Sequence, residues 1–211
     1  MADNNDHLVL ISGESSTGKS ASLQNIEDQE FWLYLNCEAG KKLPFKNKFR
    51  VKVITDPYQI FQAFVYAAEN PDKVKGIIID TLTFLMDMFE SQYVLGTANT
   101  MQGWSDYAQF FKELMQKHIA SAKFPVIILG HTRRDYDEKT LSTHVKVPVK
   151  GALQNNGIEA YFSTVVSTKK VTLDVLEEFK NDLLHITPQD ERLGYKHVFQ
   201  TQLTKETVGE R

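Results

Sequence analysis

Short, mostly apolar runs recur along the first 130 residues of the chain, and longer segments of mixed polarity separate them. The runs are Leu8–Ile11, Phe31–Leu35, Val51–Ile54, Gly76–Asp80 and Pro125–Gly130. Runs of this length with few polar positions are typical of strands covered on both faces, as in parallel sheets. We therefore expect each run to form a strand, with Leu8–Ile11, Gly76–Asp80 and Pro125–Gly130 buried in the sheet.

The segments between these runs predict helices. Lys19–Ile26 follows the first run, and Asp56–Asn70 begins with a capping Asp followed by a Pro at the first helical position. Two further helices are expected over Leu82–Tyr93 and Trp104–Ala122, the second with aromatic residues at helical spacing. Strands that alternate with helices indicate an α/β fold, in which a mostly parallel central sheet is flanked by helices on both faces.

Beyond residue 131 the alternation weakens, and the stretches Val145–Val149, Phe162–Thr168 and His197–Thr204 indicate further strands. We expect these strands to form a β-rich C-terminal extension of the sheet. A chain of 211 residues without a clear linker or internal repeat fits a single domain over residues 1–211. Within it, residues 1–7 are expected to form a disordered arm and residues 205–211 a flexible tail.

The composition excludes several classes of protein. A content of 42% hydrophobic and 24% charged residues is ordinary for a globular protein, and no apolar run approaches the roughly 18 residues of a membrane span. The polar N-terminus lacks the features of a signal peptide, and the single cysteine, Cys37, suits a reducing compartment. We expect a cytoplasmic protein. Its net charge of −3 means that any nucleic-acid site must be a local patch.

The segment Gly-Glu-Ser-Ser-Thr-Gly-Lys-Ser at positions 13–20 has the glycine and lysine spacing of a P-loop. Glycines let the backbone curl so that its N–H groups point at phosphate oxygens, and a helix beginning near Lys19 adds its positive dipole end. Lys19 is expected to reach the β- and γ-phosphates. The sequence therefore predicts an ATP site formed by Gly13, Glu14, Ser15, Ser16, Thr17, Gly18, Lys19, Ser20 and Ala21.

The metal that accompanies the nucleotide, Mg²⁺, is expected to bind at Ser20 and Asp80. P-loops place the hydroxyl at the position of Ser20 on the metal. Asp80 closes an apolar strand, at the edge where ligands of open α/β sheets bind. The alternative role for Asp80 is to cap the helix that begins near Leu82. Thr81 follows Asp80, so a glutamate that activates water has to come from elsewhere.

Glu38 and His131 each follow a predicted strand and are candidates for catalysis. Glu38 lies just past the second strand, where its carboxylate would orient and deprotonate a water molecule. His131 follows the fifth strand, where it could donate a hydrogen bond to the γ-phosphate. From position alone, a solvated glutamate and a histidine satisfied within a loop are open alternatives.

The order of these motifs resembles that of RecA-like ATPases: a P-loop, a strand ending near Glu38, a strand ending in Asp80-Thr81, and a strand followed by a polar sensor at His131. More closely, residues 8–170 resemble small phage-encoded RecA-like ATPases of the Sak single-strand-annealing type. The resemblance implies a RecA-like core with Glu38 as the catalytic glutamate. It places His131 where these proteins usually carry Gln or Asn.

The resemblance also implies an oligomer, either a ring or a filament. Lys169 and Lys170, at the end of a late strand, resemble lysines that reach the ATP of a neighbouring subunit. A cation supplied by a neighbour would stabilise charge in the transition state and make hydrolysis depend on assembly. The alternative is a solvated lysine pair at a strand end.

The stretch after His131 corresponds to the part of RecA-like proteins that binds single-stranded DNA. Its cations would neutralise phosphates, and its tyrosine could stack on a base. The candidates are Arg133, Arg134, Tyr136, Lys139, Lys146 and Lys150. Acidic residues at 135, 137 and 138 would repel phosphate, so a solvated loop is the alternative. A second basic stretch over residues 41–50 contains no acidic residue and is either a binding surface or a solvated loop.

Together these features favour an ATPase that hydrolyses ATP to ADP and phosphate, stimulated by DNA and by oligomerisation, in phage recombination, annealing or replication. Its expected partners are single-stranded DNA, further copies of the chain and a single-strand-binding protein, in the host cytoplasm. Two alternatives stay open. One is a P-loop small-molecule kinase with Arg133 and Arg134 in its lid, and the other is an ATP-dependent assembly switch without DNA binding.

Overall fold

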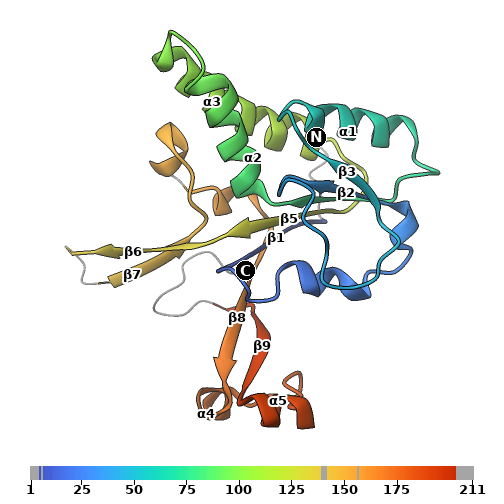
Figure 1. The fold of residues 1–211 in the computed structure, drawn as a ribbon, viewed down its shortest axis with the longest axis vertical. Helices are drawn as coiled ribbons and strands as arrows, with labels where there is room; N and C mark the ends of the chain where they lie inside the picture. The colour runs from blue at the N-terminus through green and yellow to red at the C-terminus, as the bar shows by residue number, and fades with distance from the viewer. Residues whose placement is uncertain (1–4, 6, 139–141, 156, 203–211) are drawn as a thin grey trace.

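The computed structural model describes residue 5 and residues 7–138, 142–155 and 157–202. Its strands are β1 (Leu8–Gly13), β2 (Trp32–Asn36), β3 (Arg50–Val53), β4 (Gly76–Asp80), β5 (Val126–His131), β6 (Arg133–Asp137), β7 (Ser142–Lys146), β8 (Thr164–Thr172) and β9 (Tyr195–Gln200). The central sheet has the order β3-β2-β4-β5-β1-β8-β9 (Figure 1). Its neighbouring strands are parallel, except for the antiparallel pair β8–β9. The expected mostly parallel α/β fold with a β-rich extension is thereby confirmed.

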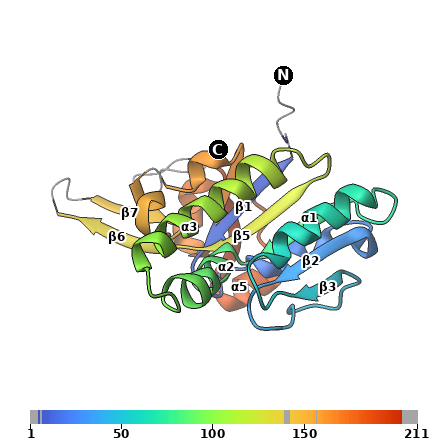
Figure 2. The same ribbon diagram turned by 90° about the horizontal axis from the view of Figure 1, so that it is seen from above.

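The helices cover the sheet unequally. The α-helices are α1 (Gln59–Glu69), α2 (Leu82–Phe89), α3 (Thr100–Glu113), α4 (Leu173–Leu176) and α5 (Pro188–Leu193). Two π-helical segments, Glu90–Val94 and Leu114–Ile119, continue α2 and α3. Short 3-10 helices form over Ser20–Asn25, Gln29–Phe31, Gly151–Asn155, Glu159–Tyr161 and Glu177–Phe179. The longest helices, α1, α2 and α3, lie together on one face of the sheet (Figures 1 and 2).

Alternate positions of each central strand face two different hydrophobic clusters. In β4, Ile77 and Ile79 belong to the larger cluster, which α1, α2 and α3 cover. Ile78 belongs to a smaller cluster, which Leu23 of the 3-10 helix and Phe49 of the loop before β3 cover. The central strands are therefore apolar at consecutive positions because both of their faces are buried.

The helix expected over Lys19–Ile26 is instead a 3-10 helix over Ser20–Asn25. The hydroxyl of Ser22 donates to the backbone carbonyl of Lys19 at 2.6 Å, a local bond that competes with regular helix geometry. A helix therefore follows the P-loop close to the expected residues, but it has 3-10 and not α geometry.

The stretch after His131 forms an antiparallel hairpin, β6–β7, where the sequence predicted a loop and a later strand. Arg133 pairs with Lys146 and Arg134 with Val145. Polar and charged residues fill β6, and local pattern reasoning therefore missed this strand. Lys139, a predicted DNA contact, lies outside the described residues.

The hairpin β8–β9 extends beyond the other strands of the sheet and carries α4 and α5 at its far end (Figure 1). The strand expected over Phe162–Thr168 continues to Thr172, and β9 begins at Tyr195 and ends at Gln200. Between them, α5 is fixed by a capping box of Thr187 and Asp190. In the described part of the chain, no helix is long and apolar enough to cross a membrane.

Candidate active site

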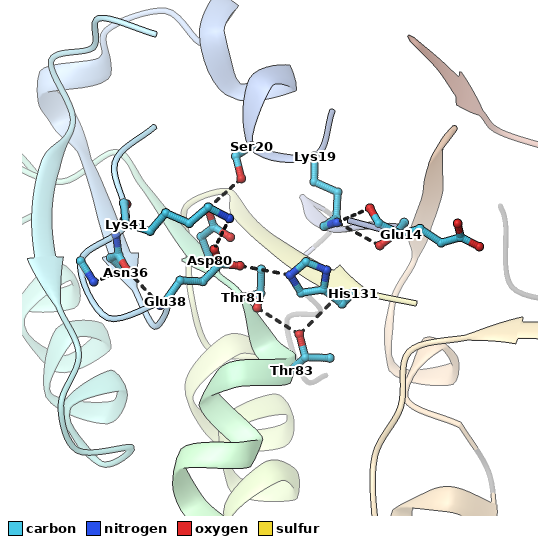
Figure 3. Close-up of polar contacts among 12 residues, drawn as sticks. Glu14, Lys19, Ser20, Asn36, Glu38, Lys41, Asp80, Thr81, Thr83 and His131 are labelled. Carbon is cyan, nitrogen blue, oxygen red and sulfur yellow. Dashed lines mark hydrogen bonds and ion pairs between the residues drawn. The ribbon is translucent and has the colours of Figure 1, made fainter. Parts of the chain in front are cut away.

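The parallel register brings the predicted site residues to one edge of the sheet. Gly13 at the end of β1 pairs with His131 at the end of β5. Asn36 at the end of β2 pairs with Asp80 at the end of β4, and Glu38 follows two residues later. Figure 3 shows these side chains converging beneath the P-loop. Since the carboxyl ends of parallel strands share one edge, strand order alone assembles this cluster.

Two glycines of the P-loop are required, Gly13 by its surroundings and Gly18 by its backbone conformation. A Cβ atom on Gly13 would lie 2.2 Å from the hydroxyl oxygen of Thr168 in β8, closer than any real contact. Gly18 has a φ of +106°, a conformation that side chains rarely adopt. Thr168 also hydrogen-bonds the hydroxyl of Thr17 at 2.7 Å. Strand β8 therefore packs directly against the loop and supports its curl.

Lys19 is buried within the P-loop. Its Nζ donates to the backbone carbonyl of Gly13 at 2.9 Å and to that of Glu14 at 2.8 Å. Burial lowers the pKa of Lys19, although Asp80 and Glu38 favour its charged form. The ammonium therefore lies where the phosphates of a nucleotide would replace two weak carbonyl partners with a strong anionic one.

Asp80 has the surroundings of a metal-binding carboxylate. Its Oδ2 accepts hydrogen bonds from the Ser20 hydroxyl at 3.1 Å and from the Tyr34 hydroxyl at 2.5 Å. Its Oδ1 is buried and has no hydrogen-bond partner among the described residues. Burial raises the pKa of Asp80 above its usual value. A bound cation would compensate the buried charge, so the predicted pair Ser20 and Asp80 fits Mg²⁺.

The described residues contain no cluster of three or more His, Cys, Asp or Glu side chains able to hold a metal by themselves. A Mg²⁺ ion in a P-loop site needs no such cluster, because nucleotide phosphates and water molecules complete its oxygen shell. When bound, the ion would neutralise charge on the β- and γ-phosphates. The donor set therefore points to a metal that arrives with the nucleotide.

Glu38 is held in a defined position at the end of β2. Its backbone N–H donates to Asn36 Oδ1 at 2.9 Å. Its Oε2 accepts from Lys41 Nζ at 2.8 Å, and its Oε1 lies 3.1 Å from His131 Nε2. Burial disfavours ionisation, but the hydrogen bonds from Lys41 and His131 outweigh it and lower the pKa of Glu38. Glu38 is therefore a carboxylate at neutral pH, the form that a general base requires.

His131 connects Glu38 to α2. Its backbone N–H donates to the hydroxyl of Thr83 at 3.4 Å, which in turn contacts the hydroxyl of Thr81 at 3.0 Å. The imidazole also packs edge-on against Phe84, with ring centroids 5.6 Å apart. The sequence left a histidine satisfied within a loop as the alternative. The structure instead brings His131 into direct contact with Glu38, a pairing that no linear spacing could reveal.

A cavity of about 580 Å³ lies over this cluster. The P-loop, Glu38, Asp80 and His131 line it, together with residues that sequence reasoning missed. The missed residues are Tyr34, Thr168, His197, Val198 and Phe199. Lys41, Lys42, Leu43 and Pro44 also line the cavity, and they belong to the basic stretch that the sequence left open as a binding surface or a solvated loop. His197 Nδ1 also lies 2.9 Å from the backbone carbonyl of Thr17, so β9 touches the P-loop. The size and lining suit a nucleotide, with apolar side chains on either side for a base.

Lys169 and Lys170 lie outside this cavity. They line a separate cavity of about 470 Å³, on the side of the P-loop that also contains Glu14 and Arg134. Lys170 Nζ stacks over the ring of Tyr195 at 3.7 Å from its centroid. Neither lysine therefore lines the nucleotide cavity of the subunit to which it belongs.

The predicted DNA-binding cations divide between the two faces of the β6–β7 hairpin. Arg133 and Lys146 both pair with Asp135, at 2.7 and 3.2 Å. Arg134 points the other way and pairs with Glu14 of the P-loop at 2.7 Å. Lys150, after the hairpin, pairs with Glu90, while Tyr136 is exposed. Asp135, one of the three acidic residues expected to repel phosphate, is thus the partner of two nearby cations.

Comparison with protein-family models identifies a match described as an AAA domain, and the match covers residues 6–209. A comparison with curated proteins found no match. The family match includes the P-loop, Glu38 after β2, Asp80 at the end of β4 and the β8–β9 extension. The chain therefore belongs to the AAA domain family, a family of P-loop ATPases that bind nucleotide.

Proposed function

We propose that this protein is a Mg²⁺-dependent ATPase that acts on single-stranded DNA as an oligomer, in phage recombination, annealing or replication. The observation that carries the DNA part of this proposal is the position of His131. This side chain lines the nucleotide cavity and also a second cavity of about 380 Å³ beside it. A ligand in the second cavity would contact the residue that holds Glu38.

The lining of the second cavity suits a nucleotide unit of a single strand. Phe84, which is 44% exposed, offers an aromatic face for a base. Arg133, Lys146 and Lys150 supply cations for phosphates. Their present carboxylate partners, Asp135 and Glu90, would have to be exchanged for phosphate oxygens. Because the three cations are partly exposed, this exchange costs little desolvation.

The contacts of Glu38 suggest how such a ligand would stimulate hydrolysis. Both carboxylate oxygens are engaged, one by Lys41 and one by His131. Each oxygen keeps a lone pair for a water molecule, but the two hydrogen bonds lower the pKa of Glu38 and so weaken it as a base. A nucleotide base stacked on Phe84 would shift His131 away from Oε1, which would then accept a proton from the attacking water. The water oxygen bonds to the γ-phosphorus as the bond from this phosphorus to the bridging oxygen breaks, with ADP as the leaving group. The products are ADP and inorganic phosphate.

The test is ATP turnover with and without a single-stranded oligonucleotide. We expect stimulation that weakens with added salt, because phosphate contacts release counterions. Phe84→Ala should bring the ratio of stimulated to unstimulated turnover close to one. Tyr66→Ala, which removes a partly exposed ring from α1, should keep the wild-type ratio.

Wild-type protein that neither binds the oligonucleotide nor responds to it would refute the DNA part of the proposal. Stimulation that survives in Phe84→Ala would refute the role given to the second cavity. The appearance of phosphate on a small acceptor, in place of free phosphate, would identify a kinase instead.

Lys169 and Lys170 are proposed to act on the nucleotide of a neighbouring subunit. Their place outside their own nucleotide cavity supports this role. Replacing both by Ala should lower turnover by about 10-fold or more, as loss of a cation from the transition state does, without lowering ATP affinity. Turnover would be measured at protein concentrations above and below self-association. Equal turnover of variant and wild type in the associated state would exclude the role.

A further inference from the structure

The far end of the β8–β9 hairpin is an acidic and apolar projection. We define the acidic arm as residues 171–194, which include α4 and α5 (Figure 1). It contains six acidic residues against two basic ones, Lys180 and Arg192, so its formal charge is −4. The acidic residues are Asp174, Glu177, Glu178, Asp182, Asp190 and Glu191. Such a charge on a protruding element favours a basic partner surface.

The acidic arm also exposes large apolar side chains. Phe179 is 58% exposed and Leu183 is 91% exposed, and Val175, Ile186 and Leu193 are exposed as well. Glu178 and Asp182 lie beside them in the chain and have no ion-pair partner within the described residues. Exposed apolar side chains with carboxylates around them are typical of a binding surface rather than of a solvated tip.

The opposite end of the central sheet has the complementary character. We define the basic edge as β3 with the loop before it, residues 40–53. This segment contains Lys41, Lys42, Lys46, Lys48, Arg50 and Lys52, and it contains no acidic residue. All four residues of β3 are exposed, and Val51 and Val53 are 55% and 44% exposed. As the last strand of the sheet, β3 has an unpaired outer side among the described strands.

Neighbouring acidic side chains reduce the charge of the basic edge without cancelling it. Lys41 pairs with Glu38 at 2.8 Å. Asp28 and Glu30 line a small cavity with Lys46 and Lys48. Asp28, however, already pairs with Lys75 at 3.4 Å. Lys52, in β3 itself, has no ion-pair partner within the described residues.

We propose that the acidic arm of one copy of this chain binds the basic edge of the next copy. The two surfaces match in charge, and both place exposed apolar side chains among the charges. They lie at opposite ends of the sheet order, a placement that favours a head-to-tail contact, in which the arm of each copy reaches the edge of the next. Head-to-tail contacts of this kind build rings or filaments. The assembly does not depend on DNA, so it can be tested separately from the DNA-binding part of the proposed function.

The contact also has a consequence for the nucleotide site. Lys42, Leu43 and Pro44 belong to the basic edge and also line the nucleotide cavity. An arm bound at this edge therefore lies beside the entrance to the ATP site of the neighbour. A strand of DNA is the competing occupant for a basic surface, but the exposed valines of β3 favour a partner with apolar side chains.

The test uses charge reversal at each surface, with association measured by sedimentation velocity. The edge variant carries Lys48→Glu and Lys52→Glu, and the arm variant carries Glu178→Lys and Asp182→Lys. We expect wild type to associate at low salt, and each variant alone to associate at least about 10-fold more weakly. A control with Lys112→Glu and Lys123→Glu has the same net charge as the edge variant and should associate like wild type.

Mixing the two variants should restore association, because each then offers the surface that the other needs. This recovery also excludes misfolding as the cause of the loss. A wild-type chain that stays monomeric at every concentration would overturn the proposal, and so would a mixture that stays monomeric. An edge variant that loses oligonucleotide binding while it associates like wild type would assign the basic edge to DNA instead.

Discussion

Replacement of Glu38 by Gln is expected to lower ATP turnover by about 10²–10⁴-fold, the usual contribution of a positioned general base, while ATP binding is retained. The amide keeps the size of the side chain but cannot accept a proton from the attacking water. The Asn36 side chain would still hold the backbone at this position. Binding of a fluorescent ATP analogue and release of phosphate, measured on the same protein, separate the two effects.

The ionisation of Glu38 adds a pH signature to this prediction. Its pKa is held below the usual value of a glutamate by Lys41 and His131, against the effect of burial. The turnover of wild type should therefore begin to fall only at a pH below the usual pKa of a glutamate, because Glu38 stays ionised until then. Glu27→Gln, which changes an exposed glutamate, is the matched control. If the Glu38→Gln variant hydrolysed ATP as fast as wild type, another group would have to accept the proton.

Replacement of Lys19 by Ala is expected to weaken ATP binding by about 100-fold. The ammonium is buried at the base of the P-loop, where a charge-assisted bond to phosphate contributes about 1.5–3 kcal/mol. No other lysine or arginine of the P-loop lines the nucleotide cavity. The other lysines that line it, Lys41 and Lys42, come from the loop before β3, and Lys41 is paired with Glu38. Turnover at saturating ATP should fall as well, since the same charge stabilises the transferred phosphoryl group.

Thermal unfolding provides the measurement and the folding control for Lys19→Ala together. Ligand that binds only the folded state stabilises wild type by about 2.7 kcal/mol at 100 times its Kd. The variant should unfold cooperatively without nucleotide and should show almost no shift when Mg²⁺-ATP is added. Lys112→Ala changes an exposed position of α3, and its unfolding temperature should rise with Mg²⁺-ATP as much as that of wild type. A full shift in Lys19→Ala would exclude the P-loop as the nucleotide site.

The local sequence determined the core of this fold. Four of the five apolar runs became buried strands of the central sheet, because a strand buried on both faces needs apolar side chains at consecutive positions. The run at Val51–Ile54 formed the exposed edge strand β3 instead. The P-loop and Asp80 could be predicted for a related reason. Their chemistry depends on residues close together in the chain and on the edge at which parallel strands end.

Contacts between distant segments decided the rest. The bond between Glu38 and His131 joins residues 93 positions apart, and the contact of His197 with the P-loop spans 180 positions. The hairpin β6–β7 could not be read from its polar sequence, because its strands pair with each other and not with the buried sheet. The acidic arm and the basic edge became complementary surfaces only when strand order placed them at opposite ends of the sheet. Local patterns report burial and turn chemistry, whereas strand order and side-chain partners follow from how the whole chain packs.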